Sequence, residues 1–263
     1  MFLVILPPVT DKLEKFAEEV ILEDYLQRIN ADLKDQRIRN RIEMVEMGYV
    51  KMGEDYLNAL RERTLLHPQG QVLQPTPRIE KAIWTAAKYH AGQMRKSSGK
   101  KMPYLSHLLS VAEILAQYTS DEDTLIAGLL HDTVEDTDCT PDDLAKDFSP
   151  EIRDIVLAVS EDKNVEKDRK ASWEDRKKSY LKNLKRGSDK AFMVSSADKI
   201  HNLRSMIEAY RECGEELWQN FNAPPDKKIW FYEEVFKIVK QRLKNAIVGE
   251  FQAELNAACE LFG

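Results

Sequence analysis

The sequence contains few glycines and almost no alternating runs of β-branched residues. It has ten glycines in 263 residues, while apolar residues recur every three or four positions, which favours helices over strands. The three cysteines, Cys139, Cys213 and Cys259, are odd in number and widely spaced. They predict neither a disulfide framework nor a zinc ribbon, and they indicate a reducing compartment, which we expect to be the cytoplasm. No stretch reaches the roughly 20 apolar residues of a membrane-spanning helix.

The net charge bears on the class of binding partner, and the helical periodicity bears on the fold. The net charge of −6 argues against a general nucleic-acid-binding protein. Helix caps and apolar stripes follow one another, and we expect an all-α protein of many helices. The segment 67–77, rich in proline and glutamine, predicts a linker. It divides the chain into an N-terminal helical hairpin extension, residues 1–77, and a larger domain, residues 78–263. The sequence does not indicate an oligomeric state.

Helix boundaries can be predicted in several places. Apolar spacing favours one continuous helix over residues 120–136 and another over residues 228–248. Thr140 and Ser149 each precede a proline and acidic residues, which is typical of a helix N-cap. We therefore expect helices to begin directly after these two residues.

The segment HDTVEDT, residues 131–137, places one histidine and three carboxylates directly after the apolar run LIAGLL. Each carboxylate at the C-terminal end of a helix faces the negative end of the macrodipole, at a cost of roughly a few tenths of a kcal/mol. A divalent cation would offset this cost and the repulsion between the carboxylates. Residues four apart on a helix share a face. We therefore expect His131 and Asp132 to bind the cation. Glu135 and Asp136 then remain free to take or relay a proton.

Two ligands cannot fill a coordination shell, and two further candidates occur elsewhere. His107 lies at the start of a predicted helix. Asp198 lies within an otherwise apolar helix, where a carboxylate needs a partner or a metal. Together with His131 and Asp132 they form a mixed set of imidazole and carboxylate ligands. Such a set suits Mn²⁺, Fe²⁺ or another borderline-hard cation.

Each of these features also has an ordinary explanation. A histidine at a helix start is often a cap or a core residue, a buried aspartate often forms a salt bridge, and an acidic cluster can be a solvated helix end. Their joint occurrence favours the metal site. His67 and His90 belong to no acidic cluster, and His201 is expected on a different helical face from Asp198. None of these three histidines is expected to be a ligand.

The order of these residues carries a family resemblance. His…His-Asp…Asp resembles the signature of the HD superfamily of metal-dependent phosphohydrolases. Four segments resemble the hydrolase domain of the RelA/SpoT family and the stand-alone small alarmone hydrolases: RKSSG, PYLSH, LLHDTVEDT and SADKIHNLRS. They follow in the family's order between Arg78 and Tyr210. The loop from Arg95 to His107 is a few residues longer than in the family, and Leu108 stands where a proline often follows the histidine. Residues 1–77 match nothing that we can place.

The resemblance implies an all-helical hydrolase with bound Mn²⁺ that removes the 3′-pyrophosphate of guanosine tetra- or pentaphosphate, (p)ppGpp, the alarmone of the stringent response. It implies that four residues bind the metal: His107, His131, Asp132 and Asp198. It implies that two residues activate the attacking water: Glu135 and Asp136. It implies that five residues lie near the nucleotide: Arg95, Lys96, Asn202, Ser205 and Tyr232.

The residues themselves also favour an anionic substrate. Between Ala86 and His107 there is no acidic residue, whereas lysine and arginine occur five times, all within residues 88–101. Arginine and lysine bind phosphate, so this basic segment 88–101 fits a polyphosphate. Other functions stay open, among them a protein whose helical N-terminus binds a partner, and two concern nucleotides. One is an HD-type phosphohydrolase acting on another nucleotide, such as NADPH or a deoxynucleotide. The other is a non-catalytic nucleotide sensor, which has no need of both Glu135 and Asp136.

Overall fold

The structure, a computed structural model, describes residue 51 and residues 73–95, 102–161 and 173–262. Within these residues the chain forms helices joined by loops, and β-structure is limited to one isolated bridge between Met94 and Pro103. The prediction of an all-α fold is therefore confirmed. The predicted N-terminal hairpin and most of the predicted linker lie outside the described residues. None of the described helices combines the length and hydrophobicity needed to cross a membrane.

The described helices fall into two groups along the chain, before and after residues 162–172. The first group is α4 (Pro77–Tyr89), α5 (Leu105–Ala116), α6 (Glu122–Leu130), α7 (Thr133–Asp136), α8 (Pro141–Asp147) and α9 (Pro150–Ala158). The second group is α11 (Trp173–Leu184), α12 (Asp189–Cys213), the 3₁₀ helix η1 (Gly214–Asn220), α13 (Pro225–Arg242) and α14 (Ile247–Phe262).

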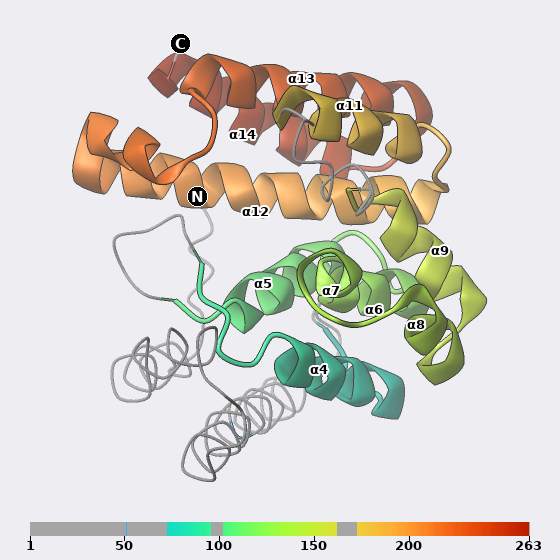
Figure 1. Cartoon of the computed structure of the whole chain (residues 1–263). Coiled ribbons are helices and arrows are strands. Elements are labelled where there is room, and N and C mark those ends of the chain that lie inside the picture. The colour runs from blue at the N-terminus through green and yellow to red at the C-terminus, as the bar shows by residue number, and fades with distance from the viewer. Residues whose placement is uncertain (1–50, 52–72, 96–101, 162–172, 263) are drawn as a thin grey trace, which may run out of the picture.

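The long helix α12 runs through the middle of the fold (Figure 1). It packs against α5, α6 and α9 on one side and against α13 and α14 on the other, while α4 covers α5 and α6. The first half of α12 is buried at every position from Ala191 to Ile200. A helix covered on one side only would show a narrower apolar stripe. Polar residues in this half of α12 are therefore held inside the protein.

The predicted caps of α8 and α9 are confirmed. The Thr140 hydroxyl accepts a hydrogen bond from the amide of Asp143, whose carboxylate in turn accepts from the amide of Thr140, forming a capping box. The Ser149 hydroxyl accepts from the amide of Ile152. Proline is the first residue of both helices, where its missing N–H costs nothing.

The prediction of one continuous helix over residues 228–248 is wrong. Helix α13 ends at Arg242, Leu243 has an extended backbone, and α14 begins at Ile247. The side chain of Asn245 accepts a hydrogen bond of 3.0 Å from the amide of Ile247 and donates one of 3.3 Å to the carbonyl of Tyr118. Asparagine side chains compete in this way with the backbone hydrogen bonds of a helix. A turn therefore forms here, although the apolar spacing of the sequence continues through it.

Candidate metal centre

The helix predicted over residues 120–136 is interrupted where two metal ligands were expected. Helix α6 ends at Leu130, His131 is its C-cap residue, and Asp132 precedes α7. The Nδ1 atom of His131 lies 2.8 Å from the carbonyl oxygen of Gly128. Because a carbonyl oxygen only accepts, Nδ1 carries a proton, and in the neutral ring Nε2 has the lone pair. In a continuous helix that carbonyl would pair with the amide of Asp132, so the imidazole competes with the helix at this point.

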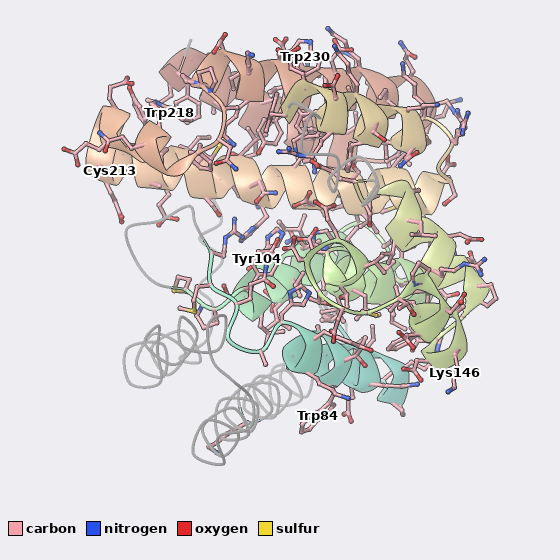
Figure 2. All side chains as sticks on the ribbon, viewed as in Figure 1. Trp84, Tyr104, Lys146, Cys213, Trp218 and Trp230 are labelled. Atoms are coloured by element: carbon pink, nitrogen blue, oxygen red, sulfur yellow. The ribbon has the colours of Figure 1, made fainter. Side chains whose placement is uncertain are left out.

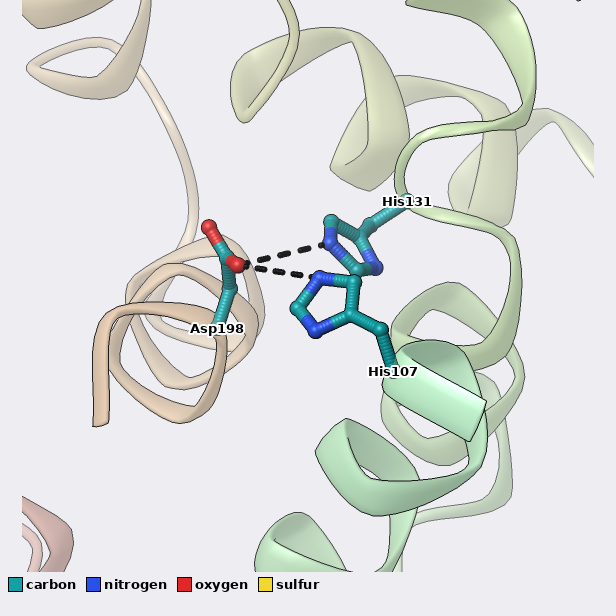
Figure 3. A group of neighbouring side chains, drawn as sticks. All are labelled: His107, His131 and Asp198. Carbon is teal, nitrogen blue, oxygen red and sulfur yellow. Dashed lines mark ion pairs between the residues drawn. The ribbon is translucent and has the colours of Figure 1, made fainter. Parts of the chain in front are cut away.

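Four side chains from three parts of the fold come together: His107 in α5, His131 and Asp132 between α6 and α7, and Asp198 in α12. The Nε2 atom of His107 lies 3.2 Å from Asp198 Oδ1 and 3.5 Å from Asp132 Oδ2. The Nε2 atom of His131 lies 3.0 Å from Asp132 Oδ2 and 3.7 Å from Asp198 Oδ1. Figure 3 shows the two rings directed at Asp198. We call these four residues the ligand cluster.

Three of the four residues in the ligand cluster form a group that could hold a metal ion. His107, His131 and Asp198 are buried, and each offers a ligand atom within 4.8 Å of the others. The Nε2 atom of His131 has no hydrogen-bond partner among the described residues, although it faces two carboxylates. Lone pairs that face carboxylate oxygens repel them unless a proton or a cation lies between. Although burial opposes the charged form, Asp132 and Asp198 raise the pKa of His131 well above its usual value. The cluster thus favours positive charge at its centre, and its mixed nitrogen and oxygen donors suit Mn²⁺.

Three polar side chains hold the carboxylates of the ligand cluster in place. The Tyr104 hydroxyl donates to Asp132 Oδ2 at 2.5 Å, and Figure 2 labels Tyr104 just before the first turn of α5. The ammonium group of Lys199 donates to Asp198 Oδ2 at 2.5 Å. The amide of Asn202 donates to the other oxygen of Asp198. Such outer partners fix the orientation of metal-binding carboxylates.

The second acidic pair lies one turn beyond Asp132. The amide of Asp136 donates to the carbonyl of Asp132 at 2.8 Å. The side chain of Glu135 accepts a hydrogen bond of 2.8 Å from the backbone amide of Glu161. The side chain of Asp136 accepts a hydrogen bond of 2.8 Å from the side-chain amide of Gln93. Burial and the charge of Asp132 raise the pKa of Glu135 to about 8 and that of Asp136 to about 6. These values suit groups that exchange a proton near neutral pH.

The structure describes four of the five residues expected near the nucleotide. Arg95 donates to Asn202 Oδ1 at 3.0 Å, which places both beside the ligand cluster. Ser205 is half-buried on the same helix as Asn202, and Tyr232 is buried in α13. Lys96 lies outside the described residues. The roles of all five in binding a nucleotide stay predictions.

The expectation that His201 lies on a different face from Asp198 is wrong. Its Nδ1 atom lies 2.8 Å from His107 Nδ1, so it faces the ligand cluster. Residues three apart on a helix are neighbours, and His201 follows Asp198 by three positions. His90 is buried, and its ring stacks on Tyr104 with 5.2 Å between the ring centroids. His67 lies outside the described residues.

Sequence reasoning missed the side chains that hold the carboxylates: Gln93, Tyr104 and Lys199. Tyr104 stands three residues before His107, and Lys199 directly follows Asp198, so proximity in the sequence was an available signal. Gln93 offered no such signal because its partner is 43 positions away. Its role becomes visible only after folding.

Comparison with known proteins finds relatives named as pyrophosphohydrolases and relatives named as GTP pyrophosphokinases. The guanosine-3′,5′-bis(diphosphate) 3′-pyrophosphohydrolase MESH1 of Drosophila melanogaster is 35% identical over 134 residues, which are 50% of this chain and 71% of that protein. The Xenopus tropicalis protein of the same name is 36% identical over 142 residues, 53% of this chain and 73% of that protein. A GTP pyrophosphokinase of Streptomyces coelicolor is 38% identical over 138 residues, 52% of this chain but only 16% of that protein.

Solved structures share the fold. One, described as "A metazoan ortholog of SpoT hydrolyzes ppGpp and plays a role in starvation responses", covers 70% of this chain and 97% of its own, with a TM-score of 0.57 and 26% identity. The structure of lmo0812 from Listeria monocytogenes EGD-e covers 60% of this chain and 96% of its own, with a TM-score of 0.51 and 28% identity. A family model described as HD domain matches residues 82–223, more than half of the sequence. The chain therefore belongs to the HD domain family.

Proposed function

We propose that this chain is a metal-dependent pyrophosphohydrolase that removes the 3′-pyrophosphate of (p)ppGpp. The relatives from Drosophila and Xenopus carry this activity in their names and match about half of the chain. His107, His131 and Asp198 could hold the divalent cation that the reaction needs. We propose Asp132 as a further ligand and Mn²⁺ as the cation. We further propose that residues 78–263 form the hydrolase unit and that residues 1–77 extend it.

One observation carries the proposal: two sets of groups with different tasks lie side by side. The Nε2 atoms of His107 and His131 each lie 3.0 to 3.7 Å from oxygens of Asp132 and Asp198. One helical turn further on, Glu135 and Asp136 have raised pKa values and are held by hydrogen bonds of their own. A nucleotide sensor needs the first set at most, whereas a hydrolase also needs a group that takes a proton from water. The pairing therefore favours catalysis over sensing.

The chemistry divides between the two sets. A divalent cation bound by the ligand cluster would polarise a phosphoryl oxygen and lower the pKa of a water molecule. In its ionised form Glu135 would take a proton from the attacking water, and the backbone amide of Glu161 fixes its carboxylate. The water oxygen bonds to the phosphorus next to the ribose, the bond from that phosphorus to the 3′-oxygen breaks, and the 3′-oxygen receives a proton. The products are pyrophosphate and a nucleotide with a free 3′-hydroxyl. Asp136 is the second group that can relay the proton.

The substrate preference follows from the basic segment 88–101. A nucleotide with pyrophosphate on both its 3′ and 5′ positions carries two clusters of negative charge around one ribose. In this proposal the ligand cluster and its cation bind the 3′-pyrophosphate. A separate basic surface must then bind the 5′-pyrophosphate. Arg95, which lies beside Asn202, and its neighbour Lys96 supply it in this proposal. Asn202, Ser205 and Tyr232 then contact the nucleoside.

Product analysis tests the proposal. Purified protein with Mn²⁺ is incubated separately with ppGpp, pppGpp, NADPH and each dNTP, and the products are separated by anion-exchange chromatography. We expect GDP and pyrophosphate from ppGpp and GTP and pyrophosphate from pppGpp, with slower turnover of NADPH and the dNTPs. Faster turnover of NADPH or a dNTP would establish the alternative phosphohydrolase. Tight ppGpp binding without turnover would establish a sensor.

A further inference from the structure

Arg95 reaches two members of the ligand cluster, each through one intermediate side chain. Its Nη1 atom lies 2.9 Å from His201 Nδ1, and that nitrogen lies 2.8 Å from His107 Nδ1. Its Nη2 atom donates to Asn202 Oδ1 at 3.0 Å, and the amide nitrogen of Asn202 donates to Asp198 Oδ1. His201 and Asn202 are consecutive residues of α12. One guanidinium group thus contacts both intermediates.

The donors and acceptors fix the direction of both paths. A guanidinium group only donates, so His201 Nδ1 is an acceptor and carries no proton. His107 Nδ1 faces the same atom, so it must carry the proton that it donates. The Nε2 atom of His107 then presents its lone pair to the carboxylates. In the same way, Arg95 holds the amide oxygen of Asn202, and this turns the amide nitrogen toward Asp198.

We propose that Arg95 is a positioning residue for the metal centre, acting through His201 and Asn202. The inference rests on the proposed function only in taking His107 and Asp198 as metal ligands. Partners of this kind typically change metal affinity by about 10- to 100-fold. If a substrate phosphate engages the same guanidinium group, nucleotide binding and metal binding are energetically coupled.

Simple electrostatics makes the opposite prediction. Arg95 carries a positive charge close to a cation site, and like charges repel. If charge alone matters, replacing Arg95 by alanine strengthens Mn²⁺ binding. If positioning dominates, the same replacement weakens it. The sign of the change in Mn²⁺ affinity therefore separates the two explanations.

The test is calorimetric titration of Mn²⁺ into the metal-free full chain without nucleotide. For Arg95→Ala and His201→Leu we expect the dissociation constant to rise about 10-fold or more. For His201→Asn we expect a smaller rise, because the asparagine oxygen can still accept the proton of His107. Lys81→Ala is the matched charge control, since Lys81 is an exposed residue of α4 that pairs with Asp147. We expect this control to bind Mn²⁺ as the wild type does.

The outcomes separate this inference from the proposed function. Unchanged or tighter Mn²⁺ binding by Arg95→Ala and His201→Leu would overturn the inference and leave the hydrolase proposal standing. Weaker Mn²⁺ binding in a protein that does not hydrolyse ppGpp would support the inference and reject the activity. Circular dichroism establishes that each variant is folded.

Nitrogen NMR of histidine-labelled wild-type protein gives a check that needs no variant. Zn²⁺ serves as the diamagnetic probe. With Zn²⁺ bound, His107 should keep its proton on Nδ1, and His201 should carry its proton on Nε2. Protons on the opposite nitrogens would overturn the inference even if every variant failed to fold.

Discussion

Lys199 donates a hydrogen bond of 2.5 Å to Asp198, and both side chains are buried. The ammonium group also lies 4.7 Å from the centre of the Tyr180 ring, which favours a cation. Although burial opposes the charged carboxylate, Lys199 lowers the pKa of Asp198 well below its usual value. Asp198 is therefore held ionised inside the protein, which is the state in which a carboxylate binds a metal.

We expect Lys199→Met to destabilise the metal-free protein by about 3 kcal/mol, because it leaves a buried carboxylate without its partner. The matched control is Lys178→Met, which removes an exposed lysine of α11 that pairs with Glu174 at 3.9 Å. The control should change the free energy of unfolding by less than about 0.5 kcal/mol. Urea denaturation measures both. Equal stabilities of the two variants would show that the buried pair contributes little.

Metal binding should depend on the ligand cluster, whereas turnover should also depend on Glu135 and Asp136. We expect Glu135→Gln and Asp136→Asn to keep nearly normal Mn²⁺ content and to lower turnover by about 10²-fold or more. His131→Ala should lose both, while Asp142→Asn, which removes an exposed carboxylate of α8, should keep both. Metal analysis and steady-state kinetics on the same samples check this. Loss of Mn²⁺ from the Glu135 and Asp136 variants would contradict the division of tasks.

Stability of the metal-free protein should depend on pH through Glu135. Burial and the charge of Asp132 raise the pKa of Glu135 from 4.5 to about 8. Between these values the folded protein holds a proton that the unfolded chain releases. The contribution of this group to the free energy of unfolding therefore falls as the pH rises from 4.5 toward 8.

Glu135→Gln removes that contribution, so its urea midpoint should decline less than that of the wild type over this range. Measurements of both proteins at four pH values between 5 and 8, on the order of one unit apart, are sufficient. Parallel curves would mean that the pKa of Glu135 is not raised in the folded protein.

The basic segment 88–101 should set substrate preference. With each variant saturated in Mn²⁺, we expect Arg95→Ala and Lys96→Ala to raise KM more than they lower kcat, because ground-state binding is lost. The effect should be larger for ppGpp than for a dNTP and should weaken at high ionic strength. Kinetics with both substrates at two salt concentrations check this, with Lys81→Ala as the control. Equal losses for both substrates would favour the alternative phosphohydrolase.

The ligand cluster could be predicted because its members are chemically conspicuous in the sequence. A histidine beside an acidic run and an aspartate inside an apolar helix are costly unless they meet a partner. The break at His131 was not predictable from apolar spacing, because a side chain competes with the backbone for the Gly128 carbonyl. The turn at Asn245 was missed for a similar reason. Both errors arise where side-chain hydrogen bonds override helical periodicity.

The position of Gln93 could not be predicted from the sequence, whereas the three-residue spacing of His201 from Asp198 was a signal that the prediction missed. Gln93 and His201 matter because folding places them next to Asp136 and His107. Neither belongs to an acidic cluster, and glutamine does not titrate. Their roles follow from which atoms donate and which accept in the folded protein.

Hydrolysis of ppGpp in ¹⁸O-labelled water with Mn²⁺ tests the proposed reaction most directly. Mass spectrometry of the products shows which bond breaks and where the water oxygen goes. We expect GDP without label and pyrophosphate carrying one labelled oxygen, because water attacks the phosphorus next to the ribose. Labelled GDP, release of orthophosphate alone, or no turnover would contradict the assignment of this chain as a 3′-pyrophosphohydrolase.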